Sequence, residues 1–147
     1  MSHTQKAAAD VHQDARRRLR AAEAASDACE KLADCACALA QIRTPAARVD
    51  AFIAAAIKSI SEAAKETADS AEWCARNMLD TEETARDIYH QAMRERAAAP
   101  FPQCDENEAE ARVHFREVER MREDAQACAR TSRECAEKIK GLCDAES

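Results

Sequence analysis

The chain has 147 residues, a formal net charge of −6 at pH 7, one glycine, three prolines and 3% aromatic residues. The acidic balance disfavours nucleic-acid binding, because a surface that binds nucleic acid normally has an excess of Lys and Arg. Ala, Glu, Arg and Lys are abundant and favour helices. Composition therefore excludes a sheet protein and predicts an all-α fold, and at this length one domain can bury its own core.

We expect residues 1–147 to form a single helical domain, an elongated antiparallel bundle with alanine-rich seams and interhelical disulfides. Four helices are predicted, the third of them short: about 4–42, 45–78, 81–98 and 106–143.

The first of these helices has two apolar faces. The main face consists of small residues at helical spacing, with Cys37 at its edge: Val11, Ala15, Ala22, Cys29, Ala33, Ala36 and Ala40. The second face contains Leu32, Cys35, Leu39 and Ile42. This second face indicates that the end of the helix is covered from two sides.

Thr44 and Pro45 are typical of a helix start, with an N-cap followed by proline at the first helical position. The seam of this second helix is Val49, Ile53, Ala56, Ile60, Ala63, Thr67, Ser70 and Cys74. The connection before it is short, so the first two helices are expected to be antiparallel neighbours.

Residues 77–80 interrupt the helical phase, and Asp80 with Glu83 resembles a capping box. A third helix over 81–98 would then place its apolar side chains inward: Ala85, Ile88, Tyr89, Ala92 and Met93. One bent helix over 45–98 is the alternative, and we favour the break.

Pro100 and Pro102 predict an interhelix loop over 100–104, after which Asp105 or Asn107 would cap the last helix. The apolar spacing of that helix alternates between four and three along one unbroken seam: Ala111, His114, Val118, Met121, Ala125, Cys128, Ser132, Cys135, Ile139 and Leu142.

Eight cysteines stand at 29, 35, 37, 74, 104, 128, 135 and 143. They serve either as small core residues, as disulfides or as metal ligands. Cys29 and Cys37 are separated by eight residues, or about 12 Å of helix, so they cannot bond to each other. Cys135 and Cys143 have the same spacing. If the first and last helices pack antiparallel, one register places Cys29 opposite Cys143 and, at the same time, Cys37 opposite Cys135.

Cys74 and Cys128 are further disulfide candidates on the seams. A fully overlapped up-down bundle would instead place Cys74 level with Cys135.

The paired cysteines resemble the coiled-coil-helix-coiled-coil-helix proteins of the mitochondrial intermembrane space, although the spacing differs from their twin Cys-x9-Cys motif. The resemblance implies oxidative import and a role as an accessory subunit of an inner-membrane complex. The span from Tyr89 and His90 through Cys104 and Glu108 to Cys128 is similar to the PDSW-type accessory subunit of respiratory complex I.

In the alternative with reduced thiols, the cysteines would line the bundle and bind Cu(I) or Zn(II), since soft thiolates favour soft ions. The candidate ligands are Cys29, Cys74, Cys128 and Cys135. Bacterial copper storage proteins have a similar arrangement, although their dense Cys-x-x-Cys runs are missing.

Catalytic sites are not predicted. His114 has Glu110 and Glu117 near it, but the Glu-x-x-His motif of a di-iron bundle is missing, so a buried, hydrogen-bonded or edge histidine is favoured. Cys104 lies at a helix start, where a thiol can be activated, yet no oxyanion cradle accompanies it.

We therefore expect a non-catalytic structural or accessory protein without a cofactor, acting as a subunit or scaffold among protein partners. It should have no membrane span of its own, since no stretch approaches the required roughly 18 apolar residues. The expected location is the mitochondrial intermembrane space. Alternatives are the cytoplasm, or the outside of the cell, as a disulfide-bonded ectodomain whose signal peptide has been removed.

Overall fold

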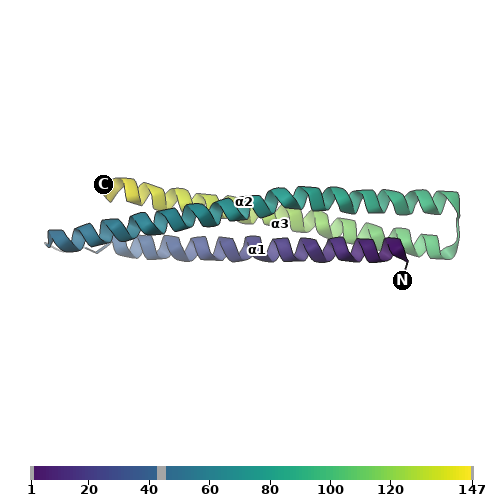
Figure 1. The fold of residues 1–147 in the computed structure, drawn as a ribbon, viewed down its shortest axis with the longest axis horizontal. Helices are drawn as coiled ribbons and strands as arrows, with labels where there is room; N and C mark the ends of the chain where they lie inside the picture. The colour runs from purple at the N-terminus through teal and green to yellow at the C-terminus, as the bar shows by residue number, and fades with distance from the viewer. Residues whose placement is uncertain (1, 43–45, 147) are drawn as a thin grey trace. The chain divides into compact units, whose positions relative to one another are not determined.

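The computed structural model describes residues 2–42 and 46–146, with side chains as far as residue 145. The described chain is all-α, as predicted, but it has three helices rather than four (Figure 1): α1 His3–Ala40, α2 Ala47–Ala98 and α3 Pro102–Glu146. The predicted loop near Pro100 is confirmed, and α3 begins at its second proline, earlier than expected. The proposed helix start at Thr44 and Pro45 lies outside the described residues.

The predicted break after residue 78 is wrong, because α2 continues through it without interruption. The hydroxyls of two threonines donate hydrogen bonds to backbone carbonyl oxygens four residues earlier in the same helix. Thr81 Oγ1 donates to the Asn77 carbonyl oxygen at 3.1 Å, and Thr84 Oγ1 donates to the Asp80 carbonyl oxygen at 3.0 Å. The polar residues that resembled a capping box therefore belong to the interior of one long helix.

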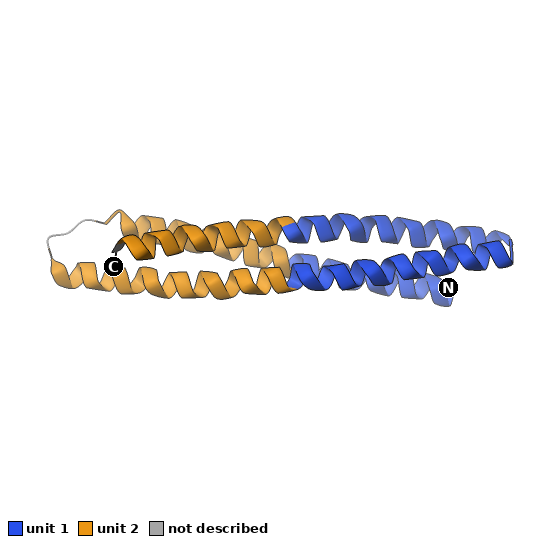
Figure 2. Cartoon of the chain, turned by 90° about the horizontal axis from the view of Figure 1, so that it is seen from above, with its two compact units in different colours: residues 1–20, 74–126 blue, residues 21–73, 127–147 orange. Residues whose placement is uncertain are grey.

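The chain divides into two compact units, and each helix contributes to both (Figure 2). Unit 1 comprises residues 1–20 and 74–126, and unit 2 comprises residues 21–73 and 127–147.

In unit 1, α1 and α3 run parallel and α2 runs antiparallel to both. The start of α1 meets the end of α2, where Thr4 Oγ1 donates to Glu95 Oε2 at 3.4 Å. The end of α2 leads directly into α3, so α1 and α3 start at the same end of the unit (Figure 1). The apolar core of unit 1 consists mostly of small side chains: Ala8, Ala15, Cys74, Ala75, Met78, Ala85, Ala92, Ala111, Phe115, Val118 and Ala125.

Ion pairs connect α2 to α3 within unit 1. Glu82, which is almost fully buried, accepts from Arg122 Nε at 2.5 Å and from Arg86 at 3.1 Å. Nearer the turn, Arg96 Nη1 contacts buried Glu108 at 2.6 Å. Each buried carboxylate therefore has a cationic partner, which offsets the cost of removing it from water.

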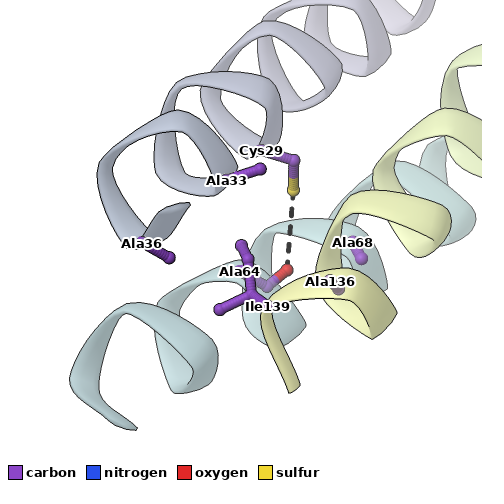
Figure 3. Close-up of a cluster of buried hydrophobic side chains, with 7 residues drawn as sticks. All are labelled: Cys29, Ala33, Ala36, Ala64, Ala68, Ala136 and Ile139. Atoms are coloured by element: carbon purple, nitrogen blue, oxygen red, sulfur yellow. Dashed lines mark hydrogen bonds between the residues drawn. The ribbon is translucent and has the colours of Figure 1, made fainter. Parts of the chain in front are cut away.

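The core of unit 2 contains a cluster of small side chains around one isoleucine (Figure 3). Its buried members come from all three helices: Cys29, Ala33, Ala36, Ala64, Ala68, Ala136 and Ile139. Leu32, Ile60, Cys135 and Leu142 pack against it and are partly buried. Alanine lets the helices approach closely, but it buries little apolar area per residue.

The predicted α3 seam is half right. Ala111, Val118, Ala125, Ser132 and Ile139 are buried as predicted. Phe115, Ala129 and Ala136 are also buried, each one residue after a predicted member of the seam. The other predicted members are only half-buried: His114, Met121, Cys128, Cys135 and Leu142. Helix α3 is therefore covered on a wider face than a two-helix seam provides.

The small-residue stripe of α1 is largely confirmed, since Ala15, Ala22, Cys29, Ala33 and Ala36 are buried. Its second apolar face is not covered from two sides, because Cys35 and Ile42 are exposed. Within the described residues, no helix has a stretch long and apolar enough to span a membrane.

Candidate functional site

The predicted interhelical disulfides are not formed. All eight cysteines lie among the described residues, none is in a disulfide, and none is within disulfide distance of another. The predicted pairing requires the first and last helices to run antiparallel, so that Cys29 lies opposite Cys143 and Cys37 opposite Cys135. Because α2 is continuous, the last helix is the third rather than the fourth and runs parallel to α1.

The eight cysteines differ widely in exposure. Cys29 and Cys74 are buried, in units 2 and 1 respectively, and Cys35 is exposed. The others are half-buried: Cys37, Cys104, Cys128, Cys135 and Cys143.

Cys29 is a member of the unit 2 cluster, and its side chain points from α1 toward Ala64 of α2 (Figure 3). Its Sγ donates a weak hydrogen bond to the Ala64 carbonyl oxygen at 3.6 Å. Burial raises the pKa of the Cys29 thiol, and the neighbouring Cys135 raises it further, while the Ser132 hydroxyl opposes the shift. Burial also raises the pKa of Cys135, as does the charge of Glu30. Both thiols are therefore kept protonated, the opposite of an activated nucleophile.

The four candidate metal ligands are not brought together as a set. Cys74 belongs to unit 1, and Cys29, Cys128 and Cys135 belong to unit 2. Throughout residues 2–42 and 46–145, no three His, Cys, Asp or Glu side chains are grouped so that they could hold a metal ion. Cys29 and Cys135 are close enough to interact electrostatically.

A histidine pair joins α1 to α3 in unit 1, with His12 buried and His114 half-buried. His12 Nδ1 lies 2.7 Å from His114 Nδ1, and the ring centroids are 4.8 Å apart with the planes at 64°. On the other side of the His12 ring, Nε2 lies 2.7 Å from Glu117 Oε2 at ion-pair distance, without the alignment of a good hydrogen bond. The favoured interpretation of His114 as a hydrogen-bonded histidine is confirmed.

The sequence reasoning missed His12, although a signal was present. His12 follows Ala8 by four residues and precedes Ala15 by three, so it lies on the buried seam of α1. Only 7% of His12 is exposed. Burial lowers the pKa of His12 from its ordinary value of 6.5, Glu117 opposes this, and His114 and Arg16 lower the pKa further.

The histidine pair has one arrangement of protons that satisfies its contacts. The two facing Nδ1 atoms need one hydrogen between them, so one ring donates and the other accepts. Because His12 Nε2 faces a carboxylate, that nitrogen holds the His12 proton, and His114 Nδ1 donates to His12 Nδ1. The pair is therefore neutral when its hydrogen bond is formed in this way.

A charged groove lies between α2 and α3 in unit 2. Its volume is about 540 Å³, and cations and anions alternate along it, among them Lys58, Glu62, Lys65 and Glu137. At this groove, Arg133 spans to α2, with Nε 2.7 Å from Glu72 Oε1 and Nη2 2.5 Å from Asp69 Oδ1. These two carboxylates raise the pKa of Arg133, so this cation ties the two helices together.

Comparison with known proteins found no relative of this chain. No protein-family model, curated protein or solved structure matches the chain.

Proposed function

We propose that this protein is a non-catalytic structural subunit or scaffold that works through contacts of its outer helix faces with protein partners. One observation supports this most strongly. The chain has only five aromatic residues, and three of them are on the surface: Phe52 is 73% exposed, Phe101 66% and Trp73 57%.

The distribution of large and small side chains is the reverse of an ordinary domain. Alanine makes up most of the core, whereas three of the five aromatic side chains lie outside it and Phe115 alone is buried. Aromatic residues contribute disproportionately to protein–protein interfaces, because they bury a large area at a low entropic cost. We interpret Phe52, Trp73 and Phe101 as contact residues for partners.

Ion pairs connect helices α2 and α3, and two of them include a buried carboxylate, Glu82 or Glu108. The pairs Arg122–Glu82, Arg96–Glu108 and Arg133–Glu72 each connect α2 to α3. These ion pairs favour a rigid helical bundle, which suits a protein that holds its partners in place.

A Cu(I) or Zn(II) protein is the alternative, and it has less support. Its four candidate cysteines are divided between two units, and a thiolate site needs ligands that converge on the ion. A place in a mitochondrial inner-membrane complex stays a prediction, and the antiparallel cysteine register that suggested it is wrong.

The test is the apparent mass of the tagged chain in a native extract, by size-exclusion chromatography. We expect elution in an assembly much larger than the 16.2-kDa chain. Replacing the exposed aromatics by Phe52→Ser and Phe101→Ser should shift the chain to the position of free protein, because the contact side chains are lost.

Ser59→Ala and Ser70→Ala form the matched control, since both positions are exposed on α2 and neither is aromatic. These changes should leave the assembly intact. The scaffold proposal is overturned if the unmodified chain elutes alone, or if the serine variants of the two phenylalanines remain fully assembled.

A further inference from the structure

We propose that His12 and His114 form an acid-sensitive latch, which holds the first half of α1 against α3 in unit 1 and releases it as the pH falls. This goes beyond the scaffold function and does not depend on it, since the latch opens or stays closed whichever partner the chain binds.

The latch can accept one extra proton but not two. With one additional proton, one ring is charged and its Nδ1–H still donates to the other ring across the 2.7 Å contact. With two additional protons, both facing Nδ1 atoms carry a hydrogen, so the hydrogen bond is lost and the two charged rings repel each other. Doubly protonated histidines therefore favour separation of the two helices.

Few side chains of this segment of α1 are buried. Within residues 3–20 they are Ala8, His12 and Ala15. Because alanine buries little apolar area, His12 is the largest buried side chain of the segment. By contrast, residues 21–40 of the same helix insert Cys29 into the unit 2 cluster.

The charged groups around the latch differ in their effect on it. Arg16 of α1 disfavours a proton on His12, and Glu117 of α3 favours one. On α2, Arg86 and Tyr89 lie against the Phe115 ring, and His90 is exposed beside Tyr89. Glu117 is the anion in contact with His12, and it can balance one positive charge but not two.

The open state binds more protons than the closed state, because release ends the burial that lowers the pKa of His12 from its ordinary value of 6.5 and ends the contact between the two facing Nδ1 atoms. Acid therefore favours opening. A difference of one proton changes the closed-to-open ratio by up to about tenfold for each pH unit below that value.

Hydrogen exchange measured by mass spectrometry tests the latch on the full chain, between about pH 7.5 and about pH 5, the interval around the ordinary histidine value. Protection factors, which correct for the intrinsic pH dependence of exchange, should fall for residues 3–20 by up to about tenfold per pH unit. Residues 21–40 of the same helix are the internal reference and should change much less.

Two glutamine variants isolate the protonation step. In His12→Gln and in His114→Gln, the side-chain amide can donate or accept by flipping, so the contact survives and double protonation is impossible. Both variants should keep the protection of residues 3–20 at low pH. His90→Gln, which removes an exposed histidine of the same unit, should respond like the unmodified chain.

The latch is overturned if residues 3–20 lose no more protection than residues 21–40 in the unmodified chain. It is also overturned if the glutamine variants open to the same extent as the unmodified chain. If His12→Gln does not fold at neutral pH, His114→Gln decides alone, because its half-buried position tolerates the change more readily.

Discussion

Cys29 and Cys35 lie six residues apart on α1 and have opposite surroundings. Cys35 is exposed, whereas Cys29 is in the unit 2 core with its pKa raised by burial. Alkylation requires an accessible thiolate. We expect Cys35 to react first and Cys29 to be among the last, and the reaction of Cys29 to need a higher pH. Peptide mapping after brief alkylation of the folded protein measures this order, which a rapid reaction at Cys29 would contradict.

Ile139 is the largest side chain of the unit 2 cluster and is fully buried. Because its neighbours are mostly alanines, which cannot move in to fill a cavity, Ile139→Ala should cost about 3–5 kcal/mol of unfolding free energy. Urea unfolding measures the loss. Leu142→Ala is the matched control at a half-buried position and should cost less than Ile139→Ala. Equal losses would show that Ile139 is not at the centre of this core.

At the scale of single helices, the continuity of α2 has a direct test at Asp80, whose side chain is exposed. Proline within a helix removes a hydrogen bond and clashes with the preceding turn. Asp80→Pro should therefore cost roughly 3 kcal/mol or more of unfolding free energy, whereas Asp80→Ala should be nearly neutral. If a loop separated two helices here, the proline would be tolerated, and a neutral Asp80→Pro would refute the single helix.

The contact between α2 and α3 in unit 1 depends on buried Glu82. Arg122 of α3 is 22% exposed and contacts this carboxylate, so Arg122→Ala removes the cation that α3 supplies and leaves Glu82 with Arg86 of its own helix. We expect a loss of about 1–3 kcal/mol by urea unfolding. Arg17→Ala, which removes an exposed pair with Asp14, should cost less than about 0.5 kcal/mol. If the two variants lost similar unfolding free energy, the Arg122–Glu82 ion pair would contribute no more to stability than an exposed pair.

For the whole molecule, composition and spacing were sufficient to predict helices, the loop near Pro100 and the small-residue stripe of α1. They were insufficient at Asp80, where polar residues on a helix surface resemble a helix start. Local sequence cannot show that Thr81 bonds to its own helix, or that Glu82 meets an arginine forty residues away.

That single error changed the direction of the last helix. An even number of helices in an up-down bundle makes the first and last antiparallel, and an odd number makes them parallel. The predicted pairs Cys29–Cys143 and Cys37–Cys135 came from the equal spacing of the cysteines, but they require the antiparallel direction that an even number of helices provides. The histidine pair was missed for the same reason, since His12 and His114 meet only when α1 and α3 run parallel.

The parallel arrangement of α1 and α3 is most directly tested by nuclear Overhauser effects between histidine rings. The chain has four histidines, so isotope-labelled histidine gives a simple spectrum, assigned with the His12→Gln and His114→Gln variants. The 4.8 Å separation of the ring centroids predicts a cross-peak between His12 and His114 at neutral pH. In the antiparallel register, His12 has no residue of the last helix beside it, and an absent cross-peak in the folded protein would contradict the three-helix account.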